Sequence, residues 1–171
     1  MTSLAQHNLP TLYTLVADYA EKGEYEIALA FYTKALNLKA EIRDKSGTAS
    51  QVDTSQIDIW HGIADIYAHQ KEGEKALSVY EKILKLNKQI GNRKDQAVTL
   101  HQIANVYVNE GREETALLIY EKSLKLEEQD INLQSKAVTL HCMAVIFAKQ
   151  GAMDKAFAYF EESLDIKKTD R

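Results

Sequence analysis

The sequence predicts an all-α protein, an array of four helix hairpins with eight helices in all. Three observations lead to this prediction. The 171 residues include one proline and seven glycines, too few for a chain of many strands and turns. A pattern of residues returns along the chain at a spacing of 40. Within each copy, apolar residues recur at i, i+3, i+4 and i+7, which is the spacing of one helix face.

The repeat is clearest in the second half of the chain. Residues 97–101 read Ala-Val-Thr-Leu-His, and the same five residues occur again at 137–141. One alanine marks the second half of every copy, at intervals of 48, 40 and 40 residues: Ala28, Ala76, Ala116 and Ala156. The additional residues of the first interval fall in the polar stretch 44–51, which predicts a loop. We therefore predict a single domain over 9–168, with repeat 1 at about 9–44, a loop at 45–53, repeat 2 at about 54–90, repeat 3 at about 92–129 and repeat 4 at about 131–168.

Each repeat divides into two predicted helices. The first helix carries large and small apolar residues at equivalent positions of one face: Leu12, Leu15, Val16 and Tyr19; Trp60, Ile63, Ala64 and Tyr67; Leu100, Ile103, Ala104 and Tyr107; Leu140, Met143, Ala144 and Phe147. The second helix places an aromatic residue four positions after its alanine: Tyr32, Tyr80, Tyr120 and Phe160. A small residue beside a large one lets two helices approach closely, so each pair is expected to pack as a hairpin.

Glycine marks the predicted turn inside most hairpins. Gly23, Gly111 and Gly151 each follow the last aromatic residue of the first helix by four positions. Glycine can take the left-handed conformation that ends a helix. In repeat 2, Lys71 occupies this place and Gly73 comes two residues later, so we expect the turn there to be shifted rather than lost. Residues 91–92, Gly-Asn, are expected to end repeat 2 and cap the next helix.

The order bulky, bulky, small, aromatic, alanine, aromatic resembles the signature of the tetratricopeptide repeat family, and repeat 2 shows it as Trp60, Ile63, Ala64, Tyr67, Ala76 and Tyr80. The resemblance covers about residues 9–168. The period of 40, and the absence of a proline that closes each repeat, resemble the family's 40-residue-repeat subclass. The resemblance implies a right-handed superhelical array, an α-solenoid, whose first helices line a concave groove.

The first helices also carry a face that points away from their apolar residues, and we predict that these faces form a binding groove. Histidines occupy equivalent positions in three repeats, at 61, 101 and 141. Imidazole, amide and carboxylate groups can hydrogen-bond a bound peptide, although repeat duplication alone would also produce such a row. The predicted partner-binding residues are Tyr13, Asp58, His61, Asp65, His69, His101, Asn105, Asn109, His141, Val145 and Lys149. Val98 and Val138 belong to the same faces.

The predicted function is a non-enzymatic scaffold that binds a peptide or helix of a partner protein in this groove. The alternative is a sensory regulator whose superhelix changes shape when a peptide binds. A net charge of −4 argues against nucleic acid as a partner. No apolar stretch is long enough to span a membrane, which takes about 18 residues. The N-terminus lacks the basic flank and apolar run of a signal peptide, so we expect a cytoplasmic protein.

Catalytic and metal-binding signals are weak. Asp65 and His69 stand at i and i+4, a spacing that can share one cation, but no third ligand lies near them in sequence. Cys142 adjoins His141, and neighbours on a helix point in different directions, so we interpret the cysteine as packing. The sequence has no glycine-rich phosphate loop, metalloprotease helix motif or nucleophile elbow. We therefore predict no enzyme, no cofactor and no metal, with an enzyme or metal-binding module as the least favoured alternative.

The last predicted helix is unusually apolar for the end of a repeat array. Phe157, Tyr159, Phe160 and Ile166 lie on it, and no capping helix follows in the sequence. Repeat arrays normally end in a polar cap that covers the last apolar face. This pattern predicts that the C-terminal face meets further repeats, a second copy in a homodimer, or another partner.

Overall fold

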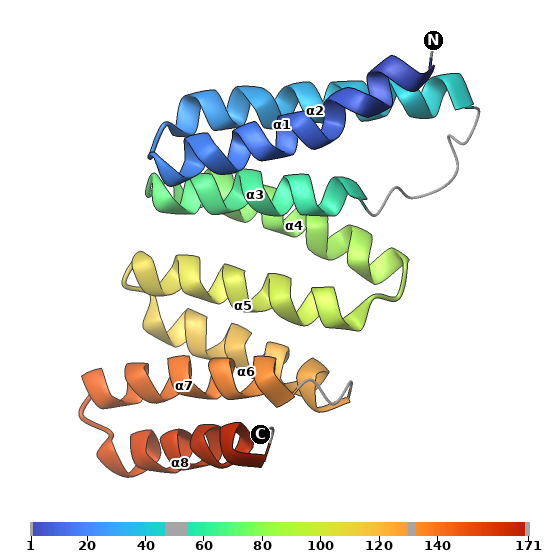
Figure 1. The fold of residues 1–171 in the computed structure, drawn as a ribbon. Helices are drawn as coiled ribbons and strands as arrows, with labels where there is room; N and C mark the ends of the chain where they lie inside the picture. Colours follow the sequence, from blue (N-terminus) through green and yellow to red (C-terminus); the bar gives the residue numbers. More distant parts are fainter. Residues whose placement is uncertain (1, 47–54, 130–132, 170–171) are drawn as a thin grey trace. The chain divides into compact units, whose positions relative to one another are not determined.

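The structure, a computed structural model, describes residues 2–46, 55–129 and 133–169. These residues are helical apart from short turns, and no strand occurs among them. The predicted all-α repeat fold, an α-solenoid of helix hairpins, is confirmed, and Figure 1 shows the helices in chain order. They are α1 (Thr2–Glu21), α2 (Tyr25–Ser46), α3 (Ser55–His69), α4 (Gly73–Gln89), α5 (Arg93–Asn109), α6 (Glu113–Gln129), α7 (Leu133–Lys149) and α8 (Met153–Thr169). Of the loop predicted at 45–53, residues 47–53 lie outside the described residues, whereas Lys45 and Ser46 belong to α2.

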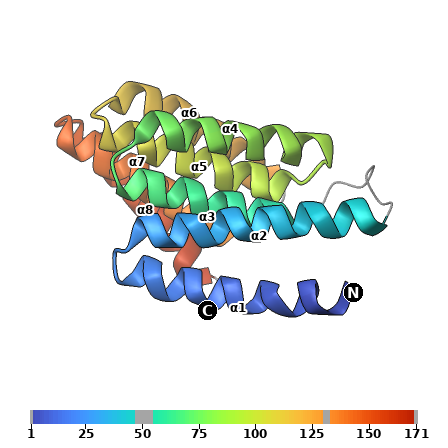
Figure 2. The ribbon, with the colours of Figure 1, turned by 90° about the horizontal axis from the view of Figure 1, so that it is seen from above.

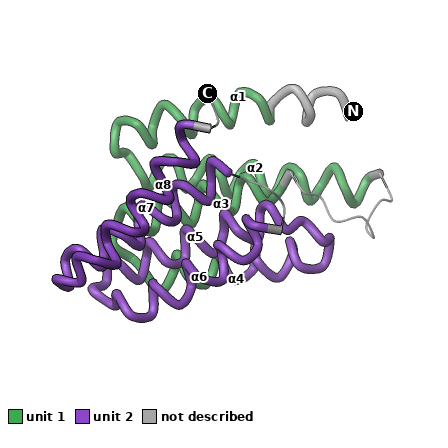
Figure 3. The backbone as a smooth tube through the Cα atoms, turned by 90° about the horizontal axis from the view of Figure 1, so that it is seen from below, with its two compact units in different colours: residues 1–79 green, residues 80–171 purple. Residues whose placement is uncertain are grey.

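The chain falls into two compact units, Met1–Val79 and Tyr80–Arg171, and the boundary between them lies within α4 (Figure 3). In the first unit α1 packs against α2, and α2 packs against α3. Figures 1 and 2 show that α1 and α2 run in opposite directions, as the two arms of a hairpin do. In the second unit α5 packs against α6, α6 against α7, and α7 against α8. Each unit is therefore built from neighbouring helices of the repeat.

The turn inside each hairpin has the same backbone geometry in all four repeats. In repeat 3 the N–H of Gly111 donates to the carbonyl of Val108 (3.0 Å), and the N–H of Arg112 donates to the carbonyl of Tyr107 (2.8 Å). This pair of bonds closes the end of a helix around one left-handed residue. Gly23, Gly111 and Gly151 hold that position with φ of 75, 73 and 75°, and Gly91 ends α4 in the same way with φ of 71°.

The expected shift of the turn in repeat 2 is wrong. Lys71 itself takes φ of 61°, its N–H donates to the carbonyl of Ala68 (3.1 Å), and the N–H of Glu72 donates to the carbonyl of Tyr67 (2.9 Å). The turn therefore keeps its register, and Gly73 is the first residue of α4. The two hydrogen bonds require a left-handed residue at this position, and they are formed although the left-handed conformation costs a lysine about 1–2 kcal/mol.

In the first unit, the contact between α2 and α3 depends on a helical glycine. Gly62 lies under the phenol ring of Tyr32, and a Cβ at this position would overlap the ring. Tyr32 packs against both buried clusters of the unit, one around Leu12, Ala35 and Ile59 and the other around Val16, Ala28 and Ile66. Glycine thus allows the aromatic residue of repeat 1 to reach the first helix of repeat 2.

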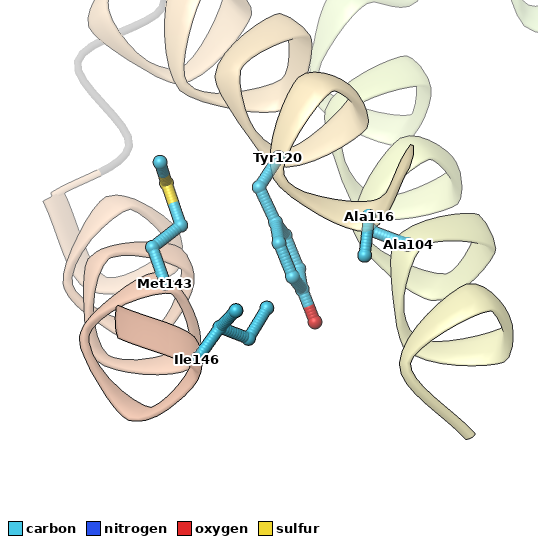
Figure 4. Packing of buried hydrophobic residues seen from close by; sticks show 5 residues of the cluster. All are labelled: Ala104, Ala116, Tyr120, Met143 and Ile146. Atoms are coloured by element: carbon cyan, nitrogen blue, oxygen red, sulfur yellow. The ribbon is translucent and has the colours of Figure 1, made fainter. Parts of the chain in front are cut away.

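In the second unit, Tyr120 of α6 is the centre of the core. Figure 4 shows its ring between Met143 and Ile146 of α7 on one side and the small residues Ala104 and Ala116 on the other. The alanines allow the close helix approach predicted from the sequence. Ser123 and Ser163 are buried at matching positions of α6 and α8, and each hydroxyl donates over 2.7 Å to a backbone carbonyl of the preceding helix, that of Ala97 or Ala137. The polar groups of these serines are therefore satisfied inside the core.

Candidate functional site

An open hollow of about 540 Å³ lies between the first helices of repeats 3 and 4, within the second unit. α5 contributes one charged, one apolar and two polar residues, and α7 contributes the rest: Lys94, Val98, His101, Gln102, Gln134, Ser135 and Val138. Val98 and Val138 are 37% and 44% exposed. The hollow therefore offers an apolar surface from both helices, surrounded by side chains that can form hydrogen bonds.

His101 joins the two helices that form the hollow. Its Nδ1 lies 3.0 Å from Oγ1 of Thr139 on α7, and its ring makes a tilted contact with Tyr120, with the centroids 5.2 Å apart. Burial lowers the pKa of His101 below the ordinary value of 6.5. The imidazole is therefore neutral at pH 7, and besides lining the hollow it contacts Tyr120 of α6 and Thr139 of α7.

Behind this wall lies a buried carboxyl group, that of Glu127 at the end of α6, which is 2% exposed. Its Oε1 accepts hydrogen bonds from Ser135 (2.7 Å) and Thr139 (3.1 Å), and it lies 3.2 Å from the hydroxyl oxygen of Ser123, whose one proton is shared with the nearer carbonyl of Ala97. Its Oε2 is buried without a hydrogen-bond partner. Ser135 and His101 both line the hollow, so the buried carboxyl group is connected to the wall by one direct hydrogen bond, from Ser135, and indirectly to His101 by way of Thr139.

Sequence reasoning missed Glu127 because it belongs to a charged stretch at a helix end, which is usually solvated. One signal was present in the pattern. Ser123 stands where repeat 2 has Ile83, and it is four residues before Glu127. A polar residue at an otherwise apolar position needs a partner, and here the partners are the carbonyl of Ala97 and the carboxyl of Glu127.

The predicted groove residues of the second unit occupy different environments. His101 lines the hollow, and His141 is exposed with its ring in tilted contact with Phe160, 5.3 Å between centroids. Asn105 accepts a hydrogen bond from the hydroxyl of Tyr120, and its amide donates to Oε1 of Gln102 (3.0 Å). Exposed positions on the same two helices are Asn109, Val145 and Lys149.

The predicted groove residues of the first unit lie on α1 and α3. Asp58 and His69 are exposed, while Tyr13, His61 and Asp65 are half-buried. The ring of His69 stacks on Tyr25 with the centroids 6.3 Å apart. Burial, with a contribution from the charge of Asp65, raises the pKa of Tyr32. Of these side chains, His69 of α3 contacts Tyr25 of α2, and the charge of Asp65 on α3 acts on Tyr32 of α2.

Cys142 packs as the sequence predicts. It is half-buried against the cluster around Tyr120, and burial raises the pKa of its thiol. A protonated thiol is a poor nucleophile.

Among the described residues, no three His, Cys, Asp or Glu side chains come together as a metal site would require. Within the same residues, no helix combines the length and the apolar character needed to cross a bilayer.

The fold and the hollow define a class of protein, the helix-hairpin repeat proteins. Two family models match the sequence, at residues 55–129 and 139–170, and both are described as tetratricopeptide repeat. Together they cover more than half of the chain, and the chain belongs to the tetratricopeptide repeat family. The resemblance seen in the sequence is confirmed. No curated protein matches the sequence.

Crystal structures of three proteins share the fold. A chain of nearly identical TPR-like repeats, described as a kinesin light chain from Podosopora anserina, is 16% identical with a TM-score of 0.70, covering 95% of this chain and 76% of that chain. MamA is 18% identical with a TM-score of 0.65, covering 95% and 80%. BtubC (BKLC) from P. vanneervenii is 17% identical with a TM-score of 0.66, covering 98% and 72%. At this identity the likeness shows the fold alone. Membership of the tetratricopeptide repeat family suggests a protein–protein interaction scaffold.

Proposed function

We propose that the protein is a non-enzymatic scaffold that binds a peptide segment of a partner protein in the hollow between α5 and α7. The observation that carries the proposal is the pair of half-exposed valines, Val98 and Val138, on facing walls of this hollow. Apolar side chains in a concave site flanked by hydrogen-bonding groups are the usual features of a ligand site. We propose a cytoplasmic location on the basis of the sequence.

A matched pair of variants tests the proposal. Random peptides displayed on phage are first selected on the wild-type chain. The affinity of the selected peptides is then measured for Val138→Asp, and for Leu118→Asp as the control. Leu118 is 60% exposed on α6 and does not line the hollow. A charge at Val138 is expected to weaken binding at least tenfold, because it has no partner once the peptide covers it. Equal affinities for the two variants would contradict the proposal.

We also propose that the apolar face of α8 meets a second copy of the chain. Phe157 and Leu164 on this face are 64% and 52% exposed. The repeat shift of 40 matches them with Leu117 and Leu124 of α6, which pack against the cluster that α7 completes. The apolar face of α8 is thus equivalent to the face of α6 that packs against α7. A two-fold axis would bring two identical α8 faces together.

A further inference from the structure

The hydrogen atoms of the network around Glu127 can be assigned by counting donors. A threonine hydroxyl has one proton, and that of Thr139 donates to Oε1 of Glu127. The 3.0 Å contact between Thr139 and His101 therefore needs a proton on Nδ1 of the imidazole. Burial lowers the pKa of His101, so the neutral ring carries this proton alone. Nε2 of the neutral ring is then a hydrogen-bond acceptor.

Ser135, the lining residue that bonds Glu127 directly, is polarised in the same sense as His101. The hydroxyl of Ser135 donates to Oε1 of Glu127 over 2.7 Å, so its oxygen keeps only acceptor capacity toward other groups. His101 and Ser135 both line the hollow, one from α5 and the other from α7. The buried carboxyl group therefore draws the protons of His101 and Ser135 inward, and Nε2 of His101 is the hydrogen-bond acceptor that results.

We propose that Glu127, acting through Thr139 and Ser135, positions the protons of the wall so that the hollow selects a ligand that donates an amide N–H next to an aliphatic side chain. The inference rests on the proposed function and adds the chemistry of the ligand. The aliphatic group packs on Val98 and Val138, and the amide N–H donates to Nε2 of His101. A peptide backbone in extended form supplies both groups, since each residue carries one N–H beside its side chain.

Glu127 and Thr139 are positioning residues in this scheme, and the tautomer of His101 reports their effect without any ligand. The chain labelled with ¹⁵N-histidine is examined by NMR at pH 8, where the imidazole is neutral. Wild type is expected to show His101 with its proton on Nδ1. Thr139→Val removes the hydroxyl and is expected to move the proton to Nε2, whereas Thr139→Ser keeps a hydroxyl and is expected to restore the wild-type spectrum.

A matched control comes from the preceding repeat. Thr99 occupies the position equivalent to Thr139, and its hydroxyl donates to the carbonyl of Asp95 on its own helix (2.6 Å). Thr99→Val is expected to leave the tautomer of His101 unchanged. A wild-type spectrum with the proton of His101 on Nε2, or an unchanged tautomer in a folded Thr139→Val chain, would overturn the assignment.

The ligand class is tested with two small amides. N-Isobutylacetamide has one N–H beside an aliphatic group, and N-isobutyl-N-methylacetamide lacks the N–H. The first is expected to bind wild type at least tenfold more tightly, measured from the shifts of the His101 ring nitrogens, and Thr139→Val is expected to abolish this preference. Equal binding of the two amides, or binding of neither, would overturn the inference on ligand class. The proposed function fails separately, if the selected peptides bind Val138→Asp and Leu118→Asp alike.

Discussion

The contact between Gly62 and Tyr32 gives a prediction whose sign depends on one neighbouring side chain. Gly62 lies inside α3, where replacing glycine by alanine ordinarily stabilises a helix by about 1 kcal/mol. Here the added Cβ would overlap the phenol ring of Tyr32, so the ring has to move. Tyr32 packs against both clusters of the first unit, and forced overpacking of this kind costs about 1–3 kcal/mol. Subtracting the helix gain from this cost, we expect Gly62→Ala to destabilise the chain by up to about 2 kcal/mol.

A double-mutant cycle separates the two contributions. In a Tyr32→Ala background the overlap is absent, and Gly62→Ala is expected to stabilise the chain by up to about 1 kcal/mol. Urea unfolding followed by circular dichroism gives the free energy of unfolding for the wild type and the three variants. The reasoning would be refuted if Gly62→Ala raised stability in the wild-type background. It would equally be refuted if the substitution cost the same with and without the Tyr32 ring.

Three further predictions concern a turn, a histidine and an oligomer. Lys71→Gly is expected to raise the free energy of unfolding by about 0.5–1 kcal/mol, because glycine takes the left-handed conformation without strain. Gly111→Lys is expected to lower the free energy of unfolding by about 1 kcal/mol for the same reason. A loss of stability in Lys71→Gly would refute this. Burial lowers the pKa of His101, so near and below about pH 6.5 the unfolded chain binds more protons than the folded chain. Between pH 7.5 and 5.5 the wild type should therefore lose more free energy of unfolding than His101→Gln, as measured by urea unfolding at both pH values. Equal losses in the two chains would contradict this. Sedimentation equilibrium is expected to show a concentration-dependent dimer that Phe157→Glu abolishes and Leu118→Glu leaves intact; a wild-type monomer at all concentrations would exclude the dimer.

The sequence was sufficient for the array because its main determinants are local. The spacing of an alanine and an aromatic residue four positions later marks every second helix, and the glycines mark most of the turns. Lys71 shows where this reasoning is incomplete. The residue type suggested a shifted turn, but the hydrogen bonds of Lys71 and Glu72 to the preceding helix determine the register.

The site could be predicted only in part, because its chemistry depends on contacts between helices. The helical periodicity predicted that Val98, His101 and Val138 lie on the groove faces of the first helices, and these three residues do line one hollow. The role of Glu127 could not be read from spacing, since its donors Ser135 and Thr139 lie on a different helix. The hydrogen bond from Tyr120 to Asn105 could not be predicted for the same reason, because it depends on how α6 packs against α5.

Methyl NMR of the complex tests most directly whether a peptide occupies the hollow between α5 and α7. The chain is labelled at its valine and leucine methyl groups and titrated with a peptide selected on the wild type. Binding in the hollow predicts that the methyl signals of Val98 and Val138 shift most and saturate together. Shifts that leave these two valines unchanged and are confined to Leu118 or Leu164 would contradict the account.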